Sequence, residues 1–196
     1  MLDALNLKKT ALVMIDLQKG IALNPHLAPY SSQEVLEKNQ RLVNHLQDTE
    51  ALIVCVHVEN YGPERLQALT ENGPLSQADV PDDFSHFILP IAQDKAAKNV
   101  IHVKKHNWGA FYGTDLDVQL RRRGIDTILL TGVATSIGCD TTAREAYQAD
   151  YQVIAVEDAM TDFNGDLHHA IVKHIFGRLG LVRKTEEVVD LIHSSI

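Results

Sequence analysis

The sequence predicts an α/β protein with a three-layer, Rossmann-like fold: a parallel sheet of about six strands with helices on both faces. Short apolar segments of strand type alternate along the chain with longer segments in which apolar residues recur at helical spacing. The strand-type segments are apolar almost throughout, which is typical of strands buried on both faces of a parallel sheet. The length of 196 residues suits one domain over residues 1–196.

The first half of the chain contributes two strands and one long helix. Residues 10–16, TALVMID, predict the first strand. Residues 31–50 predict an amphipathic helix, and Ser31 and Glu34 have the spacing of a capping box at its start. Residues 51–59, ALIVCVHVE, predict the second buried strand.

The second half continues the alternation after an irregular stretch at residues 60–97, where we expect only short elements. Residues 99–105 predict a strand, and residues 114–124 predict a helix with Thr114 as its N-cap and Gly124 just past its end. The other expected elements are a strand at 125–132, a helix within 135–149, a strand at 151–159, a helix at 165–180, a short strand at 181–184 and a helix at 185–194.

Composition and charge argue against some classes of protein. The formal net charge of −8 disfavours a nucleic-acid-binding protein, which should carry a basic surface. No apolar run reaches the roughly 18 to 20 residues of a membrane span, and the first residues do not resemble a signal peptide. Two cysteines in different contexts favour a reducing compartment over a disulfide framework. We therefore expect a cytoplasmic protein with a small-molecule substrate and neither a nucleic-acid nor a membrane partner.

Three chemically capable residues stand at strand ends. Asp16 and Lys105 each close a strand, and Cys139 follows a third strand at the start of a helix. Because ligands bind outside the carboxyl ends of parallel strands, the three should share one rim of the sheet. Each has an ordinary alternative: a turn or cap residue for the aspartate, a solvated lysine and a small buried cysteine. Cys55, inside an apolar strand, fits that last role.

Together the three residues suit nucleophilic catalysis. A nearby cation and the free N–H groups of a helix start lower the pKa of a thiol, so we expect Lys105 and the helix to activate Cys139. A buried Asp16 should have a raised pKa and serve as the base. Backbone N–H groups around Cys139 can hold an oxyanion. The set predicts acyl transfer to a thiolate with an aspartate as the base.

Two stretches of sequence carry a resemblance to a known family: ALVMIDLQKG near the start, and the stretch that begins KKHNWGAFYG and runs through TSIGCDTTAREA. They resemble the isochorismatase-like cysteine hydrolases, which include nicotinamidases, N-carbamoylsarcosine amidohydrolases, maleamate amidases and isochorismatases. The resemblance implies Asp16 as the base, Lys105 rather than Lys104 as the family lysine, and Cys139 as the nucleophile. It implies hydrolysis of a small amide or carbamoyl compound through a thioester.

The resemblance also implies the backbone of the site and the assembly. A cis peptide bond should join Val133 and Ala134. The oxyanion should be held by the backbone amides of Ala134 and Cys139. Dimers and tetramers are common in the family, so we expect a homo-oligomer.

Candidate substrate contacts come from the same resemblance. Trp108 and Phe111 match positions that line the family's pocket, although core packing is an alternative for Trp108. Gln18 and Tyr112 are weaker candidates. No pattern in the sequence identifies the substrate itself.

A metal site is not expected. Nicotinamidases of the family carry one that includes an Asp-x-His arrangement after the second strand, but here Cys55 stands two residues before His57. We interpret the adjacent His168 and His169 as surface or packing residues. The sequence therefore predicts neither a metal nor a cofactor, and nicotinamide becomes a less favoured substrate.

Two alternatives to an amidohydrolase stay open. Isochorismatases hydrolyse a vinyl ether by acid chemistry centred on the aspartate and generally lack the cysteine, so Cys139 favours the amidase reaction without excluding the other. A non-catalytic paralogue that keeps the fold as a binding module is the second alternative. The intact set of Asp16, Lys105 and Cys139 disfavours it.

Overall fold

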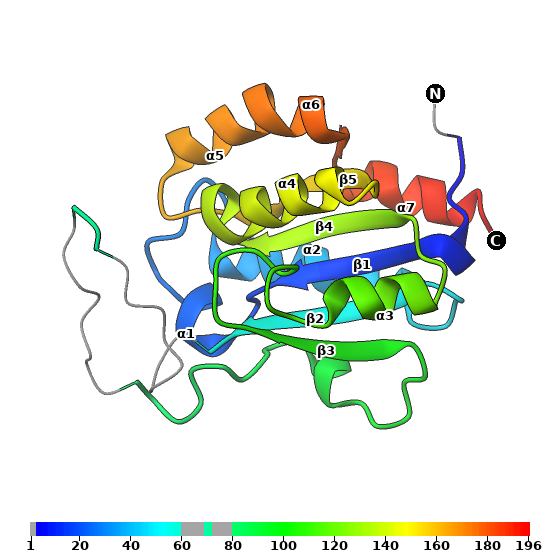
Figure 1. Ribbon diagram of the computed structural model, residues 1–196, viewed down its shortest axis with the longest axis horizontal. Helices are drawn as coiled ribbons and strands as arrows, with labels where there is room; N and C mark the ends of the chain where they lie inside the picture. The colour runs from blue at the N-terminus through cyan, green and yellow to red at the C-terminus, as the bar shows by residue number, and fades with distance from the viewer. Residues whose placement is uncertain (1–2, 60–68, 72–79) are drawn as a thin grey trace.

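Six parallel strands form one sheet in the order β3-β2-β1-β4-β5-β6 (Figure 1). The computed structural model describes residues 3–59, 69–71 and 80–196. The predicted fold class is confirmed, with a six-stranded parallel sheet. The strands are β1 (Thr10–Ile15), β2 (Leu52–Val58), β3 (Val100–Lys105), β4 (Thr127–Val133), β5 (Gln152–Thr161) and β6 (Leu181–Arg183).

Helices cover both faces of the sheet. In the view of Figure 1, α3 and α4 lie in front of it and α2 lies behind. Among the described residues, no helix combines the length and the apolar character needed to cross a membrane. The helices are α1 (Lys19–Ala22), α2 (Ser32–Leu46), α3 (Leu116–Arg122), α4 (Asp140–Gln148), α5 (Gly165–Ile171), α6 (Gly177–Leu179) and α7 (Thr185–His193), with 3-10 turns η1 (Leu7–Lys9) and η3 (Pro90–Gln93) and π-helical turns η4 (Thr135–Cys139) and η5 (Val172–Phe176).

The central strand β1 is buried along its whole length. Leu12 and Met14 point into an apolar cluster with residues of α2 and α7, whereas Ala11, Val13 and Ile15 join a second cluster with residues of α3 and α4. Successive side chains of a strand point to opposite faces, so a strand that is apolar throughout needs a cover on each face. The two helical layers supply these covers.

Most predicted elements are present with shifted ends. The capping box at the start of α2 is confirmed, because Ser31 Oγ accepts from the Glu34 N–H at 3.3 Å and Glu34 Oε2 accepts from the Ser31 N–H at 2.8 Å. Asp115 rather than Thr114 occupies the N-cap position of α3. The Thr114 hydroxyl still accepts from the Leu116 N–H at 3.1 Å, so it satisfies one free donor of the helix start.

Two helical segments differ from the prediction. The π-helical turn η4 runs directly into α4, so Cys139 is both the last residue of the turn and the N-cap of the helix. Its own N–H donates to Ala134 O at 3.1 Å. The helix expected at 165–180 consists of α5, the π-helical turn η5 and α6. The expectation of short elements at 60–97 falls partly outside the described residues, and the described part contains η3.

The carboxyl ends of the strands form one rim, and its backbone is unusual where β1 ends beside β4. Ile15 of β1 pairs with Gly132 of β4. Gly132 has a φ of 119°, and a Cβ atom there would collide with the carbonyl oxygen of Ile15. Asp16, the residue after Ile15, has a φ of 51°, and its N–H donates to Val56 O at 3.0 Å. Positive φ at these two residues sets how Asp16 leaves the sheet.

Replacing Gly132 by alanine is expected to lower the free energy of unfolding by more than about 3 kcal/mol, because the added methyl group meets the Ile15 backbone. Gly177→Ala is the matched control, since φ is −64° there and no atom lies within 4 Å of an added Cβ. The control should be neutral or stabilising by about 0.5 kcal/mol. Urea unfolding followed by circular dichroism measures both. Equal stability of the two variants would contradict this account of the rim.

Candidate active site

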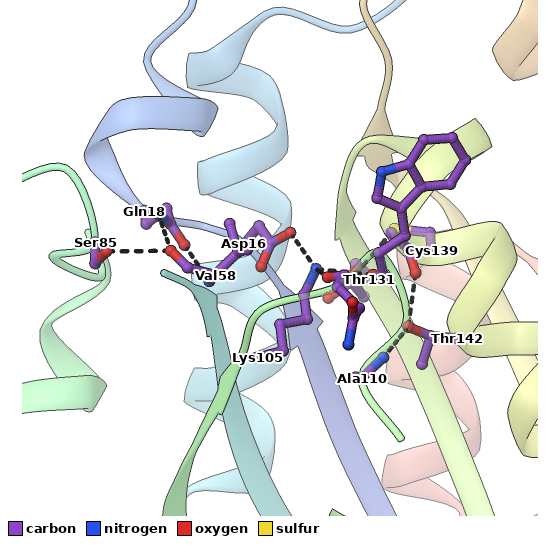
Figure 2. Close-up of polar contacts among 12 residues, drawn as sticks. Asp16, Gln18, Val58, Ser85, Lys105, Ala110, Thr131, Cys139 and Thr142 are labelled. Carbon is purple, nitrogen blue, oxygen red and sulfur yellow. Dashed lines mark hydrogen bonds and ion pairs between the residues drawn. The ribbon is translucent and has the colours of Figure 1, made fainter. Parts of the chain in front are cut away.

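The structure brings Asp16, Lys105 and Cys139 together at the rim (Figure 2). Asp16 directly follows β1, Lys105 is the last residue of β3, and Cys139 ends η4. Lys105 reaches across the end of β2, because β2 lies between β3 and β1 in the sheet. All three side chains are buried. Segments far apart in the sequence thus meet where the strand-end rule places a ligand site.

Lys105 is only 2% exposed, and its ammonium group finds all its hydrogen-bond acceptors inside the protein. Its Nζ lies 2.8 Å from Asp16 Oδ2, and it donates to the carbonyl oxygens of Asn107 at 3.1 Å and Trp108 at 2.8 Å. An ammonium carries three hydrogens, so each has an acceptor. The lysine therefore fixes both the Asp16 carboxylate and the start of the loop after β3.

Asp16 is bonded on one oxygen only. Oδ2 pairs with Lys105, whereas Oδ1 is buried and has no hydrogen-bond partner among the described residues. Burial raises the pKa of Asp16 to about 6, and the positive charge of Lys105 opposes this shift. A carboxylate with a raised pKa and one open oxygen is equipped to accept a proton.

Cys139 is a buried, neutral thiol in the resting site. Its Sγ lies 3.7 Å from the carbonyl oxygen of Thr131, which accepts the S–H. Burial raises the pKa of the thiol well above its ordinary value, the negative charge of Asp16 raises it further, and Lys105 opposes both. The expected lowering of this pKa is therefore wrong for the resting site, since desolvation by burial outweighs the positive charge of Lys105.

Gly138 allows the turn η4, the nucleophile loop that carries Cys139, to pack closely against Ile15 and Asp16. A Cβ atom at this position would lie 2.8 Å from Ile15 Cγ2 and 3.4 Å from Asp16 Oδ2. The Gly138 carbonyl accepts from Thr142 Oγ1 at 2.6 Å, and that hydroxyl accepts from the Ala110 N–H at 3.1 Å (Figure 2). These bonds tie the loop after β3 to the start of α4.

The peptide bond between Val133 and Ala134 is cis, at the position that the family resemblance implies. It immediately precedes η4, which carries Cys139. The Cys139 N–H, one of the two expected oxyanion donors, donates to Ala134 O at 3.1 Å. The assignment of the oxyanion donors to Ala134 and Cys139 stays a prediction.

Gln18 binds the protein's own backbone. Its Nε2 donates to Val58 O at 3.0 Å and to Phe84 O at 3.2 Å, and its Oε1 accepts from the Val58 N–H at 2.7 Å (Figure 2). The side chain is fully buried. Both amide hydrogens thus join the segments around β1 and β2, and the expectation that Gln18 contacts substrate stays a prediction.

The aromatic candidates divide into two groups. Trp108 is 64% exposed and Tyr112 is 74% exposed, so neither is a core residue. The backbone of Trp108 is part of the site, through its bond to Lys105. Phe111 packs against the apolar cluster under α3 and α4, with its ring 5.6 Å from that of Tyr151. Phe111 is only partly buried, so its expected place in the pocket stays a prediction.

No metal site is found in the described part of the chain, where no three His, Cys, Asp or Glu side chains gather to hold an ion. His57 lies 3.9 Å from Glu59 Oε1, and its ring centre lies 6.2 Å from that of His102. Cys55 is buried in an apolar cluster, and burial raises its pKa to about 12. The prediction that Cys55 is a buried apolar residue is confirmed.

His168 is a residue of the site region that the sequence analysis missed. It is fully buried, and its Nδ1 lies 2.8 Å from the hydroxyl of Thr135, the first residue of η4. The neighbouring His169 is exposed. Helical spacing contained the signal, because His168 stands three and seven residues before Ile171 and Ile175, on the apolar side of its helix.

Comparisons with known proteins show the family and agree with the fold. Residues 10–187 match the family model described as the isochorismatase domain. An uncharacterised isochorismatase family protein of Bacillus subtilis, YwoC, is 41% identical over 98% of this chain and 100% of its own length. The solved structure of an isochorismatase family protein from Burkholderia thailandensis is 36% identical, with a TM-score of 0.83 over 99% of this chain and 98% of the other. A cysteine hydrolase from Pseudomonas syringae shares the fold at 22% identity, with a TM-score of 0.77 over 98% and 96% of the two chains.

Replacing Lys105 by methionine is expected to destabilise the protein by about 3 kcal/mol at pH 8, because it leaves the buried Asp16 carboxylate without its cation. The loss should shrink toward pH 5. Without Lys105 the folded-state pKa of Asp16 rises further, so the carboxyl holds its proton in the folded state at acid pH and the fold is weakened only as pH rises.

Lys104→Met is the matched control for this experiment. Lys104 is exposed and pairs with Glu59 at 3.3 Å on the surface, so its loss should cost less than about 1 kcal/mol at either pH. Chemical denaturation at pH 5 and pH 8 measures both variants. The same small loss for Lys105→Met would show that the buried pair does not hold the site together.

Proposed function

The chain belongs to the isochorismatase family of hydrolases, and we propose that it is a cysteine hydrolase that cleaves a C–N bond of a small amide or carbamoyl compound. One observation carries the proposal. The Cys139 thiol is buried beside an Asp16–Lys105 ion pair whose Asp16 Oδ1 has no hydrogen-bond partner among the described residues. A thiol, an open carboxylate and a fixed cation are the parts that thioester chemistry needs.

The proposed reaction begins with proton transfer from Cys139 to Asp16. The thiolate attacks the substrate carbonyl carbon, and a C–S bond forms as the carbonyl becomes an oxyanion. Collapse of this intermediate breaks the C–N bond, and the amine leaves with the proton from Asp16. A water molecule then gives a proton to Asp16 as it adds to the thioester carbonyl; the C–S bond breaks, the acid is released, and Cys139 takes the proton back from Asp16. Lys105 remains charged throughout and balances the negative charge as it moves.

The acid–base properties of Asp16 suit this cycle. A carboxyl with a pKa of about 6 is mostly ionised at neutral pH, and it is a stronger base than an exposed aspartate. The backbone amides of Ala134 and Cys139 are the proposed oxyanion donors. The Cys139 N–H already donates to Ala134 O, so the substrate oxygen would share it in a three-centre hydrogen bond.

Vinyl ether hydrolysis of the isochorismatase type is the second candidate. The raised pKa of Asp16 favours it, because a protonated fraction persists near neutral pH and can act as an acid. Cys139 would then be dispensable. A non-catalytic binding module is the third candidate, and a Cys139 that iodoacetamide labels no faster than Cys55 would support it.

We further propose a cytoplasmic homodimer or homotetramer that needs neither a metal nor a cofactor and takes a small-molecule substrate. The oligomer and the compartment rest on the family resemblance and on the cysteine content. Light scattering during gel filtration measures the assembly.

Replacing Cys139 by alanine is expected to lower ammonia release from the substrate amide by about 10³-fold or more, since the thioester can no longer form. A panel containing nicotinamide, N-carbamoylsarcosine and maleamate is assayed first with the unaltered protein. Cys55→Ala is the matched control and should keep full activity, because its thiol lies in an apolar cluster. Mass spectrometry of acid-quenched protein should find the acyl adduct on the peptide of Cys139. Undiminished turnover in Cys139→Ala would end this proposal.

The dependence of kcat/KM on pH should report Asp16. The base must be ionised, and its folded-state pKa is about 6 rather than the ordinary 3.8. We expect kcat/KM to fall below pH 6 by about tenfold per pH unit. Circular dichroism at each pH checks that the protein is folded. Acid chemistry of the vinyl ether type predicts the opposite sign, a rate that rises as pH falls through 6, and a flat profile would exclude Asp16 as the titrating group.

A further inference from the structure

A buried histidine lies behind the nucleophile loop, outside the set of residues that the proposed reaction uses. His168 of α5 is fully buried. Its Nδ1 lies 2.8 Å from Thr135 Oγ1, and its Nε2 lies 3.8 Å from Glu157 Oε2 of β5. Within the described residues, Nε2 makes no hydrogen bond. The ring therefore stands between the loop on one side and a carboxylate on the other.

Glu157 is held in place on the far side of the histidine. Tyr30 donates its hydroxyl to Glu157 Oε2 at 2.9 Å, and Lys184 Nζ lies 3.7 Å from Oε1. The Tyr30 ring also meets His168 edge-on at 5.7 Å between ring centres. The interaction with His168 lowers the pKa of Glu157. An ionised carboxylate thus faces Nε2 and favours a hydrogen on that nitrogen.

Thr135 connects the histidine to the nucleophile loop. It is the first residue of η4, one residue after the cis peptide bond and four before Cys139. Its Oγ1 lies 3.1 Å from Thr161 O and 2.8 Å from His168 Nδ1. A hydroxyl has one hydrogen, so Thr135 donates to only one of these two partners, and the other contact depends on what the histidine ring nitrogen donates or accepts.

The next residue of the loop is held from the same side. The Ser136 N–H donates to Asp162 Oδ2 at 2.6 Å, and Asp162 is buried. Asp162 Oδ1 is itself occupied by the N–H groups of Phe163 and Asn164. Two consecutive residues at the start of η4 are thus fixed by the segment that runs from β5 into α5.

We propose that His168 is a positioning residue of the hydrolase: oriented by Glu157, it holds the Thr135 hydroxyl and thereby sets the place of the Ala134 amide and of Cys139. This inference rests on the proposed function, since it assigns a role in the same reaction. His168 touches no reacting atom and acts through Thr135.

A packing role alone does not account for the arrangement. A buried ring nitrogen without a hydrogen bond costs about 1–3 kcal/mol, and an apolar side chain of similar size would avoid that cost. The residue beside it, His169, is exposed, and its ring centre lies 5.3 Å from that of His168. The His168 ring thus lowers stability through its unbonded Nε2, and its Nδ1 contacts Thr135 of the nucleophile loop.

The test compares His168→Leu with His169→Leu, which removes the same ring from the exposed neighbour. The main readout is the rate at which iodoacetamide labels Cys139, measured by peptide mass spectrometry with Cys55 as the internal reference. We expect His168→Leu to slow the labelling of Cys139 by about tenfold and His169→Leu to change it by less than about twofold. On the amide that the panel identifies, kcat should fall similarly, with KM within about twofold.

A double variant separates positioning from general loss of packing. Thr135→Val removes the hydroxyl at nearly constant volume and should reproduce the effect of His168→Leu. Combining the two should slow labelling no further than either alone, because both remove the same contact. His168→Asn keeps an amide group near the position of Nδ1 that can bond the Thr135 hydroxyl, and it should recover most of the rate. Thermal unfolding checks the fold of each variant.

The inference is overturned if folded His168→Leu or Thr135→Val labels Cys139 at the normal rate, or if their effects multiply in the double variant. Where His168→Leu does not fold, Thr135→Val and His168→Asn decide the question in the same assay. Failure of the proposed function gives a different result: Cys139→Ala would then keep its hydrolytic activity, whatever the labelling rates of the His168 variants are.

Discussion

The buried ion pair between Asp16 and Lys105 is the interaction on which the rest of the site depends. Each charge loses several kcal/mol of hydration on burial, and attraction offsets that loss only when the geometry is good and the remaining donors are bonded. Lys105 meets this condition through the carbonyl oxygens of Asn107 and Trp108. The pair therefore fixes the carboxylate and the loop after β3 with the same three hydrogens.

Two glycines make this arrangement possible without contributing any chemical group. Gly132 lets β4 lie against the end of β1 where a side chain would collide with Ile15, and Gly138 lets the nucleophile loop lie against Asp16. Because neither has a Cβ atom, the thiol and the carboxylate can lie close together at a packed sheet edge. A side chain at Gly132 would press on the Ile15 backbone and one at Gly138 on the Ile15 side chain, so either substitution would shift the neighbouring Asp16.

The hydrophobic pattern and the strand-end rule were sufficient to predict the fold and the meeting of Asp16, Lys105 and Cys139, because both depend on local sequence. They could not predict the side-chain environments, which depend on the course of the loops. Gln18 and Phe111 match pocket positions by their place in the sequence, yet one binds backbone and the other packs beside Tyr151. The thiol pKa was misjudged for a related reason, since burial of a group is a property of the whole fold.

In the proposed reaction, the raised pKa values of Asp16 and Cys139 have a common cause and opposite consequences. Burial makes Asp16 a better base and makes the thiol a poorer acid, so the proton stays on sulfur in the resting site. The thiolate, not the thiol, reacts with alkylating agents, so the rate at which iodoacetamide labels Cys139 depends on how readily Asp16 takes the thiol proton. In the proposed reaction, sulfur becomes negatively charged when Asp16 takes its proton, and the charge then moves to the substrate oxygen. Lys105 stays beside Asp16 throughout. Reactivity in the proposed reaction thus depends on proton transfer from Cys139 to Asp16, so the placement of the turn that carries Cys139 matters more than the acidity of the free thiol.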